Sequence, residues 1–566
     1  MKDLILINCK MHPNSSSKPR DERTKGANGV AGNFGAGDEA LVISGGKIAM
    51  ITDFEQAREK YPHAKIKDLN GRTVLPGFVD SHIHMLQTGY LKVNLNLSQV
   101  KSIQRLKELI RQEAKGKTPG EWIIATSFDE TNLVEKRVPT KEDLDGAAPF
   151  NPVFLIRVCT HLFVANSKAL EMVGIGKDTP SPQGGIISKD SRGNPTGILK
   201  DNAADQVYDV INGDYEIQKE SLRAALKEVT QAGITTVHDM AIGIKNINHY
   251  LKIMDMYREV LKEEGFPLRI VLGVEHYLLD DILKQGIEFL QGDDYFRQGY
   301  IKLFLDGSFG GRTALLKSKY KDEDEGGGGG GDGHGLLTME ESEIQAAVSK
   351  AAQQGFQCAV HALGDGALEK AFEQLAACNS TDLRHRIVHG GIADSDMIAR
   401  IAANNIPVDF QPHFLASEVG WISDVLGEDQ VKNLYRWKSM LEEGVHLAAG
   451  SDSPVEPVNP LLGVKSAVLR QTEELWPPGG FNPEECLTVE EMLKAYTYSG
   501  ACQYFEEDYK GRIKPGYYAD LVVLSEDPRE VSAFELDRIE VEMSLVGGRI
   551  VYEKDDRSDY TSVFND

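Results

Sequence analysis

The feature that most constrains the fold of this chain is a repeated alternation of two residue patterns. Short, apolar, β-rich runs end in a polar or titratable residue, and helical patterns such as residues 220–231 and 338–354 separate them. The runs are residues 74–84, 234–237, 268–274, 300–305, 356–360, 386–388, 406–410 and 445–450. Strands that alternate with helices form a parallel sheet, and eight such units predict an α/β fold with a closed (β/α)8, TIM-like barrel.

Several titratable residues lie where these runs end, which is the end of a barrel strand that carries the chemistry. His82 and His84 are two residues apart, so on a strand their imidazoles point to the same side and can bind one metal ion. A lone pair with this spacing is more often a surface or hydrogen-bonded pair, so the prediction depends on later strand ends. Those supporting residues are Lys302, His361, His389 and Asp452.

The two ends of the chain and one internal segment fall outside the barrel pattern. β-like runs near residues 4–9, 41–51, 521–524 and 544–552 predict one β-sandwich built from both chain ends. Mixed helical and β-like runs predict an inserted α/β subdomain. We therefore expect a sandwich from residues 1–73 and 507–566, a barrel from 74–90 and 216–506, and the inserted subdomain at 91–215.

Two polar insertions interrupt this plan, near residues 12–39 and 322–335. The first is rich in Ser, Gly and Asn, and the second contains an acidic run followed by six glycines at residues 326–331. Neither can bury a core, so both are predicted to be loops. The second is either a lid or an inert insertion, and the sequence favours the inert reading.

Charge and cysteine content exclude some classes of partner. Lys and Arg number 62 and Asp and Glu 86, a formal net charge of −24, which argues against nucleic acid or an anionic membrane as partner. The sequence contains no long apolar stretch, so we do not expect integral membrane association. The six cysteines are scattered and are typical of free thiols in a reducing compartment, so we expect a cytoplasmic protein. We expect its partner to be a small-molecule substrate. A homodimer is one open option for its assembly.

Six motifs in order along nearly the whole chain resemble the amidohydrolase superfamily, in particular its subgroup that includes the N-substituted formamide deformylases. They are PGFVDSHIH (76–84), IKLFLDGSFGGRTALL (301–316), VHALGDGA (360–367), RHRIVHG (384–390), GSDSPV (450–455) and ADLVVLSEDP (519–528). A chance match to all six in order is negligible. The resemblance implies a metal-dependent hydrolase, and the two insertions depart from the family pattern without removing any of its ligand positions.

The resemblance also implies a set of metal ligands. It assigns His82 and His84 to the deeper of two metal ions, and His361 and His389 to the second. Histidine and carboxylate ligands suit Zn²⁺ best, with manganese, iron and nickel open, and the number of ions is one or two. For the later histidines, the alternative is a packed core histidine.

Lys302 and Asp452 complete the implied site. Lys302 would be carboxylated by CO2 and bridge the two ions, since a neutral lysine at a desolvated strand end can add CO2. Asp452 would contact the deeper ion and act as the general base, passing a proton from the attacking water to the leaving amine. The alternatives are a barrel-lining salt bridge for Lys302 and a helix N-cap for Asp452.

Four further residues are candidates for contact with substrate. His413 either polarises the substrate carbonyl or only lines the pocket. Asp306 and Arg312 shape the pocket or pair with each other. For His161, in the inserted subdomain, the resemblance implies that the side chain reaches toward substrate. The alternative is a structural histidine.

We therefore expect hydrolysis of a non-peptide C–N bond, in a linear amide or an N-acyl or N-formyl amine. One alternative is a cyclic-amide hydrolase or deaminase of the same superfamily. The other is a metal-free barrel that serves as a binding or signalling protein, against which the intact ligand set counts.

Overall fold

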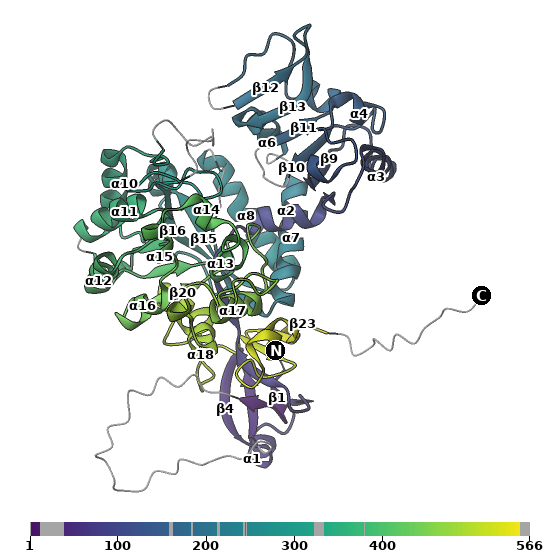
Figure 1. The fold of residues 1–566 in the computed structure, drawn as a ribbon. Coiled ribbons are helices and arrows are strands. Elements are labelled where there is room, and N and C mark those ends of the chain that lie inside the picture. The colour runs from purple at the N-terminus through teal and green to yellow at the C-terminus, as the bar shows by residue number, and fades with distance from the viewer. Residues whose placement is uncertain are drawn as a thin grey trace. The chain divides into compact units, whose positions relative to one another are not determined.

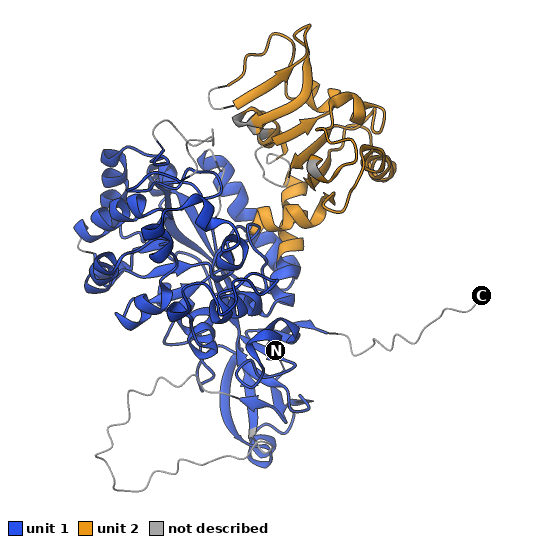
Figure 2. Ribbon diagram, viewed as in Figure 1, with its two compact units in different colours: residues 1–84, 226–566 blue, residues 85–225 orange. Residues whose placement is uncertain are grey.

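The structure is a computed structural model that describes residues 2–11, 39–157, 162–182, 185–211, 215–240, 244, 246–321, 333–378 and 380–554. The chain divides into two compact units, residues 1–84 with 226–566 and residues 85–225 (Figure 2). Most of the two predicted insertions, at residues 12–38 and 322–332, and His161 lie outside the described residues. The finer domain limits given above stay a prediction.

The first unit contains a sheet of eight parallel strands whose order follows the chain (Figure 1). The strands are β7 (Phe78–Ile83), β14 (Ile234–Asp239), β15 (Arg269–Glu275), β16 (Phe296–Phe304), β17 (Cys358–Ala362), β18 (Arg386–His389), β19 (Val408–Phe410) and β20 (Leu447–Ala449). Hydrogen bonds from Asp452 N to His82 O (2.7 Å) and from Ser451 N to Asp80 Oδ1 (3.0 Å) join the end of β20 to β7. The predicted TIM-like barrel is therefore confirmed.

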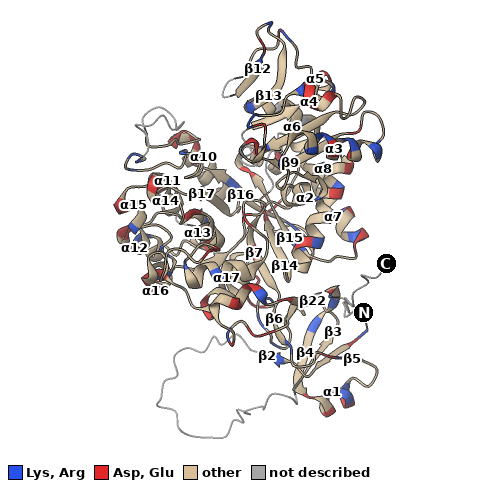
Figure 3. Ribbon diagram, turned by 45° about the vertical axis from the view of Figure 1, so that its right-hand side comes forward, with Lys and Arg blue, Asp and Glu red and all other residues tan. Residues whose placement is uncertain are grey.

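Helices cover the outside of this barrel. They include α8 (Ile247–Glu263), α9 (Leu279–Lys284), α10 (Glu341–Gln353), α11 (Asp365–Ala377), α12 (Ser395–Ala403), α13 (Pro412–Glu418), α14 (Ile422–Val425), α15 (Glu428–Lys432), α16 (Trp437–Glu442), α17 (Pro460–Leu469), α18 (Val489–Lys494) and α19 (Gly500–Gln503). Helix α7 (Tyr215–Gln231) begins in the second unit and ends in the first. In α8, Tyr250, Ile253 and Tyr257 are buried at helical spacing, which gives the helix one apolar face. Charged residues lie mainly in helices and loops, whereas the strands are mostly uncharged (Figure 3).

The run at residues 74–84, predicted as one barrel strand, is two strands in two different sheets. β6 (Thr73–Pro76) pairs with β21 (Leu521–Leu524), and β7 begins the barrel. Gly77 separates them, and a Cβ at this position would lie 2.3 Å from the Thr235 side chain. Only glycine fits this turn, which delivers the chain to the barrel with His82 and His84 at the far end of β7.

Two smaller sheets form the β-sandwich. One has the order β4-β3-β1-β5 and the other β2-β6-β21-β22-β23. Their further strands are β1 (Leu4–Ile7), β2 (Lys10–Met11), β3 (Glu39–Ser44), β4 (Lys47–Asp53), β5 (Lys65–Asp68), β22 (Val541–Val546) and β23 (Arg549–Glu553), with helix α1 (Phe54–Lys60) after β4. Leu6, Leu41, Leu521 and Leu545 share one buried core, so both chain ends build this sandwich, as predicted.

The second unit is a six-stranded sheet with the order β12-β13-β11-β10-β9-β8. The strands are β8 (Leu95–Asn96), β9 (Ile123–Phe128), β10 (Val153–Arg157), β11 (Leu162–Ala165), β12 (Gly185–Lys189) and β13 (Pro195–Asp201), and the helices are α2 (Met85–Val93), α3 (Ile103–Lys115), α4 (Lys141–Asp145), α5 (Ser167–Met172) and α6 (Asp205–Ile211). Successive β10 residues, Phe154 and Leu155, belong to two different hydrophobic clusters, so both faces of the sheet are covered. None of the helices in the described ranges is both long and apolar enough to span a bilayer.

Candidate metal centre

Two strand ends bring three potential metal ligands together. The Nε2 atoms of His82 and His84 each lie 3.1 Å from Oδ1 of Asp452. His82 is in β7, His84 follows it, and Asp452 follows β20; all three side chains are buried, with ligand atoms within 4.8 Å of one another. The prediction that residues 82 and 84 face one side is confirmed, and Asp452 meets them across the barrel seam.

Backbone contacts explain why these ligands converge. Oδ1 of Asp80 accepts hydrogen bonds from His82 N (3.1 Å) and Ser451 N (3.0 Å), so one carboxylate ties β7 to the segment after β20. Asp452 has φ 56° and His389 has φ 75°, left-handed conformations that are unusual for non-glycine residues. Such strain persists only where the surroundings impose it, and it clusters at functional sites.

Through its two hydrogen bonds, Asp80 positions the ligands of both segments, a role that sequence analysis did not assign.

The second predicted pair also comes together. Nε2 of His389 lies 3.0 Å from Nδ1 of His361, and the ring of His389 is 5.3 Å from that of His82, centroid to centroid. His389 Nδ1 lies 2.6 Å from Oε1 of Gln411, to which it donates when it carries the ring proton. Likewise, Nδ1 of His84 donates to the carbonyl oxygen of Met240 (2.6 Å). Fixing the proton on Nδ1 leaves Nε2 as the electron-pair donor, the usual arrangement of a metal-bound histidine.

Lys302 lies in β16 with its side chain fully buried. Its Nζ has no hydrogen-bond partner among the described residues and sits 4.6 Å from the centroid of the Phe304 ring. Burial lowers the pKa of Lys302 to about 7. Lys302 forms no ion pair with any of the described residues, so the alternative of a barrel-lining salt bridge finds no support.

The electrostatics of the site favour neutral imidazoles. Burial, with a contribution from nearby Lys302, lowers the pKa of His82 to about 3. Burial also holds the pKa of His389 well below its usual value, and the neighbouring His361 adds to this effect. Neutral imidazole is the form that binds metal.

The unpartnered atoms of the site show whether a metal would fit. Oδ1 of Asp452, Nδ1 of His82 and Nζ of Lys302 are buried and have no hydrogen-bond partner in the described part of the chain. A buried carboxylate oxygen between two imidazole nitrogens is costly without a cation, because nothing compensates its lost hydration. The residues therefore fit a divalent metal ion.

The remaining candidates take different positions. Asp306 is buried, and its carboxylate accepts hydrogen bonds from the backbone N–H groups of Leu315, Leu363 and Gly364 at 2.9–3.0 Å. Its Oδ1 also lies 3.2 Å from His361 Nε2. Arg312 donates to the backbone carbonyl oxygens of Phe309 and Gly310. Asp306 thus holds the loop after β16 against the loop after β17.

His413 lies in the first turn of α13, directly after β19. Its Nδ1 is 2.5 Å from Oε2 of Glu456, and both side chains are buried. Sequence analysis identified His413 but missed Glu456 and the contact between Gln411 and His389. A signal for Gln411 was present, since it ends a barrel run, whereas nothing in the sequence pairs residue 456 with residue 413.

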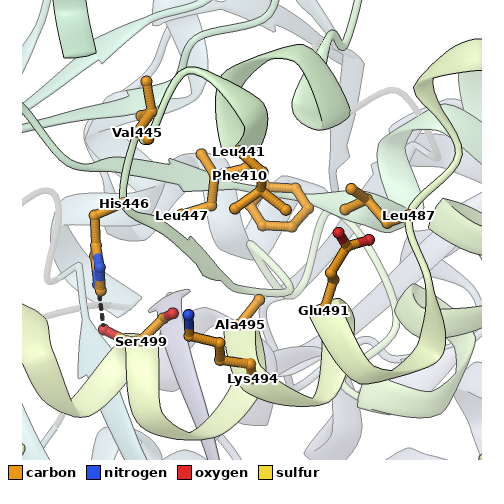
Figure 4. Close-up of a pocket in the computed structure, with 11 residues that line it drawn as sticks. Phe410, Leu441, Val445, His446, Leu447, Leu487, Glu491, Lys494, Ala495 and Ser499 are labelled. Atoms are coloured by element: carbon orange, nitrogen blue, oxygen red, sulfur yellow. Dashed lines mark hydrogen bonds between the residues drawn. The ribbon is translucent and has the colours of Figure 1, made fainter. Parts of the chain in front are cut away.

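A cavity of about 330 Å³ lies outside the barrel, between β19 and β20 and the helices α16 and α18 (Figure 4). Its lining includes Phe410, His446, Glu491 and Lys494, and no candidate metal ligand. His446 donates to the carbonyl oxygen of Ser499 (2.9 Å), and Glu491 pairs with Lys438 (2.6 Å). This cavity is separate from the candidate metal centre.

Comparisons with known proteins show the family of this chain. The profile of the amidohydrolase family matches residues 65–552. The chain is 35% identical over 523 residues to YtcJ of Bacillus subtilis (strain 168), which is named as an amidohydrolase; the match covers 91% of this chain and 96% of YtcJ. It is 28% identical over 571 residues to the N-substituted formamide deformylase of Arthrobacter pascens, covering 98% of this chain and 99% of that protein.

A solved structure extends the likeness to three dimensions. An uncharacterized metal-dependent hydrolase from Pyrococcus horikoshii OT3 has a TM-score of 0.77 and 28% identity, and the match covers 94% of this chain and 99% of that one. The resemblance in the six sequence motifs is thereby confirmed. This chain belongs to the amidohydrolase family of metal-dependent hydrolases.

Proposed function

We propose that the protein hydrolyses the C–N bond of a linear amide or an N-acyl or N-formyl amine. The observation that carries this proposal is the convergence of His82, His84 and Asp452 around an unpartnered carboxylate oxygen at the carboxyl ends of barrel strands. The name of the Arthrobacter relative, an N-substituted formamide deformylase, supports this choice of substrate.

In this proposal the metal is Zn²⁺, as one or two ions. His82, His84 and Asp452 would hold the first ion, and His361 and His389 the second, with Lys302 between them. A divalent cation bound there supplies Lewis acidity and lowers the pKa of water. Lys302 joins the site as a carbamate: its lowered pKa provides the neutral amine that adds CO2, and the product is an anion rather than a buried cation.

The chain's own groups then move the protons. Asp452 accepts a proton from the attacking water and donates it to the leaving nitrogen. His413 interacts with the carbonyl oxygen of the substrate, on which negative charge develops. Asp306 shapes the pocket through the loops that it holds, and Arg312 contacts the substrate, whereas the substrate role of His161 stays a prediction from the resemblance.

A cytoplasmic location belongs to the same proposal. Five cysteines, Cys9, Cys358, Cys378, Cys486 and Cys502, are described and all are free thiols. Free thiols are usual in proteins of reducing compartments.

The test is a substrate screen with the Zn²⁺-loaded protein. p-Nitroformanilide and p-nitroacetanilide represent linear amides, dihydrouracil represents cyclic amides, and adenosine represents deaminase substrates. We expect release of nitroaniline, faster from the formanilide. Turnover of only the cyclic amide or of adenosine would overturn the substrate proposal, and inactivity on every compound together with no bound metal would favour a binding protein.

A further inference from the structure

A buried histidine–carboxylate pair lies beside the candidate metal centre. His413 and Glu456 are 9% and 8% exposed, and Nδ1 of His413 lies 2.5 Å from Oε2 of Glu456. Since a carboxylate only accepts, the Nδ1–H of His413 donates to it. A hydrogen bond between a buried imidazole and a carboxylate orients the ring and stabilises its positive charge.

The neighbours of this pair place it at the site. Gln411, two residues before His413, contacts Nδ1 of His389, and the ring of Phe414 stacks on that of His389, with centroids 5.7 Å apart and planes 13° apart. Glu456 follows Asp452 by four residues, in a segment held by a hydrogen bond from Val455 N to Asp452 O (2.9 Å). Glu456 thus lies in a segment that carries a proposed metal ligand, Asp452, and His413 lies in a segment that contacts another, His389.

The other ring nitrogen of His413 is available. Among the described residues, Nε2 of His413 has no hydrogen-bond partner. It is also not one of the fully buried unpartnered atoms, so it retains access to solvent. An imidazole whose Nδ1–H is fixed by a carboxylate and whose Nε2 stays accessible can serve a ligand only through Nε2. If the ring were purely structural, its second nitrogen would have no need of access.

We propose that Glu456 is a positioning residue, which holds His413 as an imidazolium so that Nε2–H donates to the carbonyl oxygen of the substrate. This inference rests on the proposed function. In this inference, the positive charge of His413 stabilises the developing oxyanion, and Glu456 favours that charged form of His413. Without the carboxylate, His413 would lose the acceptor that orients its ring and favours its positive charge.

A second carboxyl group makes the assignment more specific. Oε2 of Glu418 accepts a hydrogen bond from the Tyr435 hydroxyl (2.6 Å), and burial, with the nearby negative charge of Glu456, raises the pKa of Glu418 to about 7. Glu418 thus contacts Tyr435, and Glu456 is the carboxyl group that contacts His413. Glu418 is not required in this role.

The kinetic test uses Glu456→Gln, Glu456→Asp, His413→Asn and the double variant, all Zn²⁺-loaded, on p-nitroformanilide. We expect kcat to fall about 10²-fold or more in His413→Asn, a typical loss for one oxyanion donor, with KM and bound metal little changed. Glu456→Gln should lose most of that activity, Glu456→Asp should regain part of it, and the double variant should be no worse than His413→Asn. Additive losses, or changes in KM alone, would overturn the proposal.

Glu485→Gln is the matched control. Glu485 is also a buried glutamate, 4% exposed, but it accepts from Ser439 N (2.9 Å) and contacts Arg436, away from the metal ligands. Its replacement should change stability without changing kcat. A kcat loss in Glu485→Gln equal to that in Glu456→Gln would show that burial of a glutamate, and not the pair, matters.

A readout that needs no substrate separates this inference from the proposed function. In ¹⁵N-histidine spectra of the Zn²⁺-loaded protein, the signals lost in His413→Asn belong to His413. We expect both ring nitrogens to be protonated at neutral pH, and Glu456→Gln to convert them to a neutral ring. Unchanged His413 signals in Glu456→Gln would refute the inference even if the enzyme is a deformylase, and the expected change would support it even if the substrate class is wrong.

Discussion

Replacing Lys302 by Met in the metal-free protein should increase stability, although it removes a proposed catalytic ligand. The ammonium group of Lys302 is buried without a hydrogen-bond partner among the described residues, and burial lowers its pKa from 10.5 to about 7. Met is unbranched and of similar length, so it fills the same space without a charge. The variant is therefore more stable because it no longer bears the free-energy cost of burying a charged lysine.

The size and the sign of the effect follow from linkage. The folded-state pKa lies below the unfolded value, so the unfolded chain binds more protons between pH 7 and 10.5, and the wild type loses stability as pH falls through this range. With roughly 1.36 kcal/mol per pH unit, the full cost is about 5 kcal/mol. Lys302→Met should thus gain about 4 kcal/mol at pH 7, about 2 kcal/mol at pH 9, and almost nothing above pH 10.5.

The assay is thermal and urea unfolding of chelator-treated protein in CO2-free buffer at several pH values. Lys432→Met, which replaces an exposed lysine of α15, is the matched control and should show no such dependence. A gain that does not change with pH, or a destabilised Lys302→Met protein at pH 7, would show that the lysine is not held as a costly buried amine.

Three changes test the other roles, and one tests the second insertion. Asp452→Asn should keep most of the metal and lose roughly 10²–10⁴-fold in kcat, and activity within about threefold of wild type would rule out the base. Asp306→Ala leaves three backbone N–H groups without an acceptor and should lose about 3 kcal/mol or more in thermal unfolding, whereas Asp306→Asn should lose less. Asp80→Ala should weaken metal affinity about 10–100-fold in a chelator competition, and unchanged affinity would exclude its positioning role. Deleting residues 322–331 should leave the unfolding temperature unchanged, and a changed turnover would identify a lid.

The barrel and its ligand-bearing strand ends were predictable because both follow from periodicity. A strand fixes which side chains share a face, so His82 and His84 could be placed together without knowledge of the fold. A closed parallel barrel then brings the ends of all its strands to one rim, which explains how Asp452 meets them from a run far along the chain.

The parts that were not predicted depend on contacts without a period. The change of sheet at Gly77 follows from the Thr235 side chain, which leaves no room for a Cβ. The pairing of Glu456 with His413 depends on how the loop after β20 meets α13. The backbone amides bound by Asp306 belong to two loops, and loop conformation has no repeat in the sequence.

The most direct test of the central claim is the metal content of the purified protein, measured by mass spectrometry after Zn²⁺ loading and removal of free ions. The account predicts one or two Zn²⁺ per chain in the wild type, with loss of bound metal and of amide hydrolysis together in Lys302→Ala. Formate or acetate should partly restore activity in that variant, because a free carboxylate can occupy the place of the lysine carbamate. A wild-type protein that binds no divalent metal, or a Lys302→Ala protein that keeps two ions and full activity, would contradict the account.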